Sequence, residues 1–108
     1  MADPKTVIIT GAGSGIGAAT AKRFSADGWN VVLNGRTRDK LEAVAKDLAG
    51  DRTLVIDGDV SNANDVSHLV AETVSRFGGR DCLVNNAGIA KMGALGDLSQ
   101  DDFQQLLS

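Results

Sequence analysis

The chain has 108 residues, of which 43% are hydrophobic and 23% charged, with a formal net charge of -3 and a single cysteine. This length and composition predict one globular domain over residues 1–108 and exclude disordered, collagen-like and coiled-coil chains. Because the charges are interspersed and no apolar run nears the roughly 20 residues of a membrane helix, we expect no nucleic-acid partner, no membrane span and a cytoplasmic location.

Apolar, β-branched runs alternate with helical patterns along the chain, which is typical of βαβ units and a parallel sheet. The runs that predict strands are residues 6–10, 31–35, 54–57 and 81–85. Helices are expected over residues 15–27, 40–49 and 62–77, and a further helix from Ser99 onward. The expected helix signals are Ser61 as the N-cap of the third helix and Gly28, Gly50 and Gly78 as C-terminal stops.

Right-handed crossovers place the first two helices on one face of the sheet and the third on the other. The predicted strand order is 3-2-1-4, a doubly wound α/β sheet. Because the order reverses between strands one and four, a crevice is expected at their carboxyl ends, where open α/β sheets bind ligands. Two glycine-containing turns, residues 11–17 and 86–88, fall at this crevice.

The first of these turns carries four glycines in the run Gly-Ala-Gly-Ser-Gly-Ile-Gly at positions 11–17. Gly11 permits a sharp turn off the strand, and Gly15 and Gly17 let a phosphate and the sheet approach the helix start closely. Free N–H groups there attract an anion. A plain tight strand-to-helix turn is the alternative, but the number and position of the glycines favour phosphate binding.

The end of the second strand reads Asn34-Gly35-Arg36-Thr37-Arg38. A dinucleotide-binding fold commonly has an acid at this place, roughly 20 residues after the glycines, to hold ribose hydroxyls. This segment has no carboxylate to repel a 2'-phosphate, and Arg36 offers a planar donor fork to bind one. NADP is therefore expected in preference to NAD. The alternative is that Arg36 and Arg38 only solvate the start of the second helix.

Two shorter motifs follow the third and fourth strands. Asp59, which precedes Val60, is predicted to accept a hydrogen bond from an exocyclic amine or, alternatively, to be a turn acid that bonds its own backbone. Residues 85–88, Asn-Asn-Ala-Gly, are either a cofactor contact or a strand-ending turn.

Together these residues resemble the short-chain dehydrogenase/reductase family, over all 108 residues. Residues 10–17 are similar to its TGxxxGxG motif, residues 85–88 to its NNAG motif, and Asp59-Val60 to its Asp-Val pair. The resemblance implies an incomplete Rossmann-type fold with a dinucleotide site. For the pyrophosphate the resemblance implies Gly11, Ser14, Gly15, Ile16 and Gly17, and for the 2'-phosphate it implies Arg36. For the adenine it implies Asp59 and Val60, and for the ribose it implies Asn86, Ala87 and Gly88.

The family's catalytic Tyr, Lys, Ser and Asn have no counterpart here, and the chain contains no tyrosine at all. We therefore assign no catalytic residue and no metal site. The resemblance implies the N-terminal, cofactor-binding part of a longer, homo-oligomeric NADP-dependent oxidoreductase. That enzyme would transfer hydride between nicotinamide and a carbonyl or alcohol substrate.

The alternative is a non-catalytic NADP-binding module or truncated sensor. In either case the fourth strand is expected to be a sheet edge. We expect a missing C-terminal segment or another chain to pair with that edge.

Overall fold

The structure is a computed structural model that describes residues 4–13, 15–79, 82–85 and 88–92. The elements in chain order are β1 (Thr6–Ile9), α1 (Gly15–Ala26), β2 (Asn30–Gly35), α2 (Arg38–Ala45), the short 3₁₀ helix η1 (Gly50–Arg52), β3 (Thr53–Asp57), α3 (Ala63–Phe77), β4 (Cys82–Asn85) and β5 (Gly88–Met92). The helix predicted from Ser99 onward lies outside the described residues.

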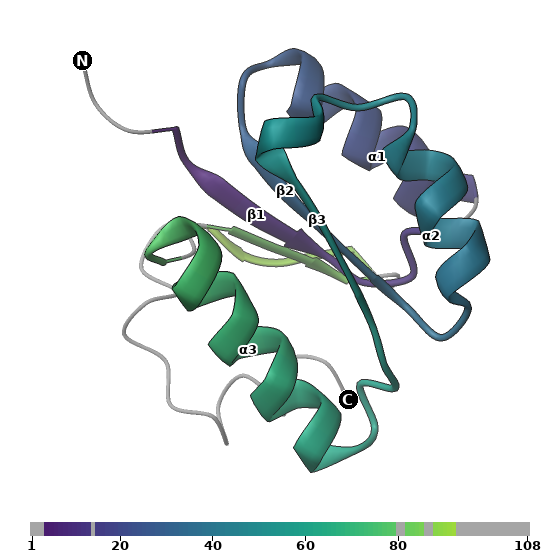
Figure 1. Cartoon of the computed structure of the whole chain (residues 1–108), viewed down its shortest axis with the longest axis vertical. Helices are drawn as coiled ribbons and strands as arrows, with labels where there is room; N and C mark the ends of the chain where they lie inside the picture. The colour runs from purple at the N-terminus through teal and green to yellow at the C-terminus, as the bar shows by residue number, and fades with distance from the viewer. Residues whose placement is uncertain (1–3, 14, 80–81, 86–87, 93–108) are drawn as a thin grey trace.

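The strands form one five-stranded sheet in the order β3-β2-β1-β4-β5. β1 lies in the middle, parallel to β2 and to β4, and β3 runs parallel to β2. The first four strands therefore have the order and direction that the crossovers predict. Figure 1 shows α1 and α2 on one side of the sheet and α3 on the other, as expected for right-handed connections.

The central strands are buried on both faces of the sheet. Val7 and Ile9 of β1 pack in one cluster with Leu41 of α2, and Ile8 packs in a second cluster with Val66 of α3. Three of these five side chains lie on β1 and the other two on helices far from it in sequence, and all five have no exposed surface. Burial on both faces explains why these strands are continuous apolar runs and not alternating patterns.

The outer side of β4 is not an open edge, so the sequence prediction is wrong at this place. β5 pairs with β4 in antiparallel orientation, with Cys82 opposite Met92, and the register shifts between Leu83 and Val84. Only residues 86–87 separate the two strands in sequence, a length typical of a hairpin and too short for a parallel crossover. Pairing by the chain's own next segment satisfies backbone groups that an edge strand leaves unpaired.

Glycine ends two helices as predicted, whereas α2 ends differently. Gly28 and Gly78 have φ values of 88° and 81°, in the left-handed region that favours glycine. α2 begins at Arg38 and ends at Ala45, where the sequence predicts residues 40–49. Gly50 therefore does not stop α2. The chain continues in i to i+3 hydrogen bonds, such as the one from the Leu48 N–H to the Ala45 carbonyl at 3.0 Å, towards η1.

The N-cap of α3 is Asn62, one residue after the predicted Ser61. The Asn62 side-chain oxygen accepts a hydrogen bond from the Asp65 N–H at 3.0 Å. The Ser61 hydroxyl donates instead to Asp59 Oδ1 at 2.7 Å. Ser61 is thus already engaged in the preceding turn, and the next residue caps the helix.

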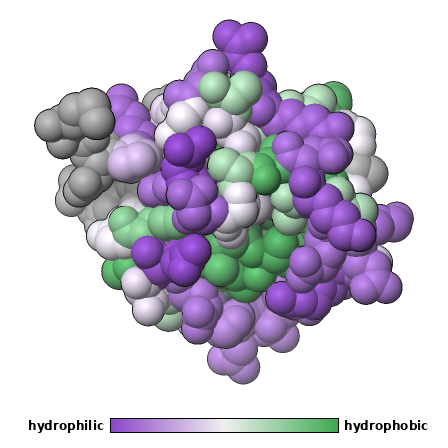
Figure 2. Space-filling view, turned by 45° about the horizontal axis from the view of Figure 1, so that its top comes forward, coloured by the Kyte–Doolittle hydropathy of each residue, from purple (hydrophilic) through white to green (hydrophobic). Residues whose placement is uncertain are grey.

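Figure 2 shows one face of the molecule on which hydrophilic side chains predominate and apolar side chains gather in one central area. Among the described residues, the exposed large hydrophobic side chains are Ile16, 81% exposed, and Val74, 39% exposed. Of the helices that the structure describes, none has the length and apolar character to cross a membrane.

Candidate functional site

The turn between β1 and α1 is bent sharply and tied to both neighbouring strands. Gly11 has a φ of 60°, which confirms the predicted sharp turn, and Gly15 has a φ of 59°. The Thr10 N–H donates to the Val84 carbonyl at 2.9 Å, and the Ala12 N–H donates to the Asn34 carbonyl at 3.0 Å. These bonds place the turn between the carboxyl ends of β4 and β2.

Gly17 allows α1 to pack directly against this turn. A Cβ at Gly17 would lie 2.1 Å from the Gly11 carbonyl oxygen, whereas a Cβ at Gly15 would meet nothing within 4 Å. Glycine is therefore required at positions 15 and 17 for different reasons. Gly15 supplies a backbone conformation, and Gly17 supplies the close approach of helix to strand. The first N–H groups of α1, which have no partner within the helix, consequently start beside the turn.

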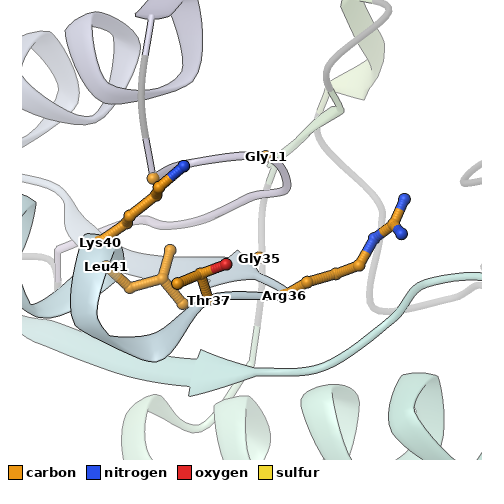
Figure 3. Close-up of a pocket in the computed structure, with 7 residues that line it drawn as sticks. Gly11, Gly35, Arg36, Thr37, Lys40 and Leu41 are labelled. Carbon is orange, nitrogen blue, oxygen red and sulfur yellow. The ribbon is translucent and has the colours of Figure 1, made fainter.

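A hollow of about 190 Å³ lies between this turn and the start of α2 (Figure 3). Its lining comes from the turn after β1 and from the segment after β2: Gly11, Gly13, Gly35, Arg36, Thr37, Lys40 and Leu41. The volume is below the roughly 300–1,000 Å³ of a site that encloses a drug-sized ligand. The hollow is therefore too small to enclose such a ligand by itself.

Arg36 and Arg38 have different environments. Arg38 donates to Asp57 Oδ1 at 2.8 Å and pairs with Glu42 at 3.3 Å, so it joins the start of α2 to the end of β3. Its hydrogen bond lowers the pKa of Asp57. Arg36 is exposed at the hollow and makes no hydrogen bond or ion pair with another described residue. Arg38 therefore has a structural role in joining these two segments, whereas no described residue gives Arg36 such a role.

Asp59 lies in the turn after β3 and accepts two hydrogen bonds from Ser61. Its Oδ1 accepts from the Ser61 hydroxyl at 2.7 Å and from the Ser61 N–H at 2.9 Å, and these bonds lower the pKa of the carboxyl. The positive charge of Arg36 lowers this pKa further. Asp59 thus has the geometry of a turn acid, while no described residue donates to its Oδ2. Val60 packs against the cluster beneath α3.

The remaining candidate residues are placed only in part. Ser14, Asn86 and Ala87 lie outside the described residues. Gly88 is the first residue of β5 and pairs with Asn85. The structure brings the glycine turn and Arg36 to one hollow, with the exposed Ile16 at the start of α1.

Sequence reasoning missed Lys40, which lines the same hollow. No signal in the sequence singles it out, because Arg36 lies before the start of α2 and helical spacing does not relate the two residues.

Residues 5–108 match the sequence model of a family described as short chain dehydrogenase. Glucose 1-dehydrogenase from Gluconobacter oxydans is 43% identical over 107 residues, which are 96% of this chain and 40% of that protein. An uncharacterized oxidoreductase from Staphylococcus haemolyticus is 41% identical and is covered to 45% of its length. The chain therefore spans less than half the length of these curated relatives.

A solved structure agrees with the sequence matches. The crystal structure of a 3-ketoacyl-(acyl-carrier-protein) reductase from Brucella melitensis, complexed with NADH, is similar to this chain with a TM-score of 0.72 and 40% sequence identity. The similarity covers 76% of this chain and 33% of that one.

Proposed function

The chain belongs to the short-chain dehydrogenase family, and on this basis we propose that it is the cofactor-binding part of an NADP-dependent oxidoreductase. The reaction is hydride transfer between the nicotinamide and a carbonyl or alcohol group of a small-molecule substrate. The share of its relatives that the chain covers, 40% and 45%, supports a role as one part of a longer protein. A cytoplasmic location and a homo-oligomeric assembly belong to the same proposal.

The observation that carries the proposal is the hollow beside the glycine turn with Arg36 at its rim. Arg36 has no acidic partner at ion-pair distance among the described residues, so its guanidinium is available to an anionic ligand. A carboxylate at the end of β2, which would accept from the ribose hydroxyls of NAD, is absent from residues 34–38. The donor set at this end of the cofactor site therefore fits a phosphate better than a diol.

The described residues divide the binding of the cofactor among them. The N–H groups at the start of α1 and the turn at Gly11, Gly15 and Gly17 bind the diphosphate, because unpartnered helix N–H groups and the helix dipole attract anions. Ile16, which is 81% exposed, covers the cofactor with apolar surface. Asp59 accepts from the adenine amine through Oδ2. The bound dinucleotide itself would donate the hydride to a carbonyl or accept it from an alcohol.

The candidate residues outside these contacts remain part of the proposal. Ser14 extends the diphosphate-binding turn, and Val60 lies against the adenine beside Asp59. Asn86, Ala87 and Gly88 support the ribose next to the nicotinamide. A relative that is 40% identical was solved with NADH, which supports a nicotinamide cofactor but leaves the 2'-phosphate as the finer part of the proposal.

Isothermal titration of the chain with NADP and with NAD tests the choice of cofactor. A charge-assisted hydrogen bond to a phosphate is worth about ten to a hundredfold in affinity, before solvent screening. We expect NADP to bind more tightly than NAD, and Arg36→Ala to remove most of that difference while NAD affinity stays nearly unchanged.

Arg23→Ala is the matched control, because Arg23 is an exposed arginine in the last turn of α1 and does not line the hollow. Equal losses of NADP and NAD affinity in Arg36→Ala would mean that Arg36 supports the fold. Equal affinities of the unmodified chain for the two cofactors would refute the proposed preference.

A further inference from the structure

Asn34 and Gly35, at the carboxyl end of β2, connect three segments of the sheet edge. The Asn34 carbonyl accepts from the Ala12 N–H of the glycine turn at 3.0 Å, and the Gly35 carbonyl accepts from the Gly58 N–H after β3 at 2.9 Å. The Asn34 side chain donates from Nδ2 to the Ile56 carbonyl of β3 at 2.9 Å. This dipeptide therefore joins the turn after β1 to the turn after β3.

The two residues lie on opposite faces of the sheet, and packing explains both. Asn34 is only 2% exposed and shares a face with Val32, which packs beneath α3. Gly35 lies beneath α2, where a Cβ would be 3.2 Å from Leu41 Cδ2. In the folded chain the amide has a buried partner, and the glycine leaves room for a helix.

The same pair of residues has a reaction available to it when the chain is unfolded. Asn34 is the one asparagine of the sequence that precedes a glycine, and glycine has no Cβ to hinder attack by its nitrogen. The Gly35 nitrogen, after giving its proton to hydroxide, attacks Asn34 Cγ, and a cyclic imide forms. The side-chain nitrogen takes a proton from water and leaves as ammonia. Water then opens the ring at either carbonyl, so the products are aspartate or isoaspartate, without any oxidation or reduction.

The folded chain opposes each step of this reaction. Gly35 lies opposite Asp57 in the parallel ladder of β2 and β3, which holds the backbone extended. Ring closure needs the Asn34 backbone to rotate until the Gly35 nitrogen faces Cγ, and this rotation would break the bonds to Ala12 and Gly58. The bond to the Ile56 carbonyl holds the amide in place, and burial keeps water from it.

We propose that Asn34-Gly35 is a deamidation site of the unfolded chain, which the pairing of β2 with β3 keeps closed in the native protein. This inference is independent of the proposed function. Deamidation to aspartate would replace the Nδ2 donor with a buried carboxylate oxygen facing the Ile56 carbonyl. Isoaspartate would lengthen the backbone of β2 by one carbon and put the rest of the strand out of register. A long stay in the unfolded state therefore becomes irreversible at this dipeptide.

The first test compares the deamidation rate of the 108-residue chain at mildly alkaline pH in buffer and in concentrated urea. Mass spectrometry of the tryptic peptide of residues 24–36 measures the gain of mass when an amide becomes an acid, and fragment ions distinguish Asn34 from Asn30. We expect the rate at Asn34 to be at least about a hundredfold higher in urea, because reaction in buffer must wait for local opening.

Gly35→Ala should slow the reaction in urea about tenfold, because the added methyl group hinders the attacking nitrogen. Gly50→Ala is the matched control, since Gly50 follows an alanine and should leave the rate unchanged. Equal rates in buffer and in urea would mean that the fold does not protect the site. A rate at Asn34 in urea no higher than at Asn30, or one that Gly35→Ala leaves unchanged, would equally overturn the inference.

The second test concerns the product. Asn34→Asp should melt at least about 10 °C below Asn64→Asp, its matched control, because Asn64 is an exposed residue in the first turn of α3. Circular dichroism measures both transitions, and an Asn34→Asp protein that does not fold at all supports the inference. Equal melting temperatures would show that the sheet tolerates a carboxylate at position 34 and would refute the irreversible step.

Discussion

Gly17→Ala tests whether the glycine turn owes its shape to the packing of α1 on β1. The added Cβ would lie 2.1 Å from the Gly11 carbonyl oxygen, 2.8 Å from the Gly11 carbonyl carbon and 3.0 Å from the Ala12 Cα. All three are backbone atoms, which cannot rotate away as a side chain can. Since a carbon–oxygen contact needs about 3.3 Å, α1 would have to retreat by roughly 1 Å.

The expected loss of stability follows from this clash. Overpacking costs about 1 to 3 kcal/mol where neighbours adjust, and a clash with immobile backbone puts the cost at about 3 to 5 kcal/mol. This cost is offset by about 1 kcal/mol, because alanine has a higher helix propensity than glycine. The free energy of unfolding should therefore fall by about 2 to 4 kcal/mol. For a domain of this size that loss lowers the melting temperature by about 10 to 30 °C.

Thermal unfolding followed by circular dichroism measures the effect. Gly50→Ala is the matched control, since a Cβ at Gly50 meets nothing within 4 Å and its φ is not positive. That variant should change stability by less than about 1 kcal/mol. A Gly17→Ala protein that melts within about 3 °C of Gly50→Ala would refute the packing argument.

Three further predictions concern the cap, the acid and the chemistry. Asn62→Ala should cost about 1 kcal/mol in urea unfolding, and Ser61→Ala less, because Asn62 is the cap and the Ser61 N–H still binds Asp59. The hydrogen bond from Arg38 lowers the pKa of Asp57, so this pair stabilises the fold at pH values above 3.8, the ordinary pKa of an aspartate. The stabilisation is lost as the pH falls through the lowered pKa. The difference in melting temperature between the unmodified chain and Asp57→Asn should therefore become smaller below about pH 4. The chain should not oxidise NADPH in the presence of a carbonyl substrate, which the absorbance of NADPH measures. The reason is that the chain has no tyrosine to act as the family's general acid, a group that contributes about 10² to 10⁴ in rate.

The parallel part of the sheet was predictable because its signals are local. Val7, Ile8 and Ile9 form an apolar run whose alternate side chains reach both faces, and only a strand between two helix layers buries such a run. Right-handed crossovers then leave few strand orders. Gly28 and Gly78 end their helices through a backbone conformation that the residue type itself favours. These features need no knowledge of distant contacts.

The candidate site was predictable where the residue type alone restricts the local backbone conformation. The glycine spacing indicated a sharp turn at Gly11, and the structure has one. Lys40 was missed because an exposed lysine on a helix start has no distinctive pattern. Its position at the hollow comes from the close packing of α2 against the turn at Gly13, a residue on another segment.

Tertiary structure alone decided which groups pair with one another. Arg36 and Arg38 are equivalent in sequence, yet only Arg38 meets Asp57, because the start of α2 lies beside the end of β3. Likewise β5 takes the outer side of β4, where the sequence predicts an open edge. Hydrophobic periodicity in the sequence indicates which side chains of a segment become buried, and the free energy gained by burying them is large. The partners of exposed charges and of edge strands depend on small interaction energies between segments that are distant in sequence. These partners are therefore decided only when the fold brings the segments together.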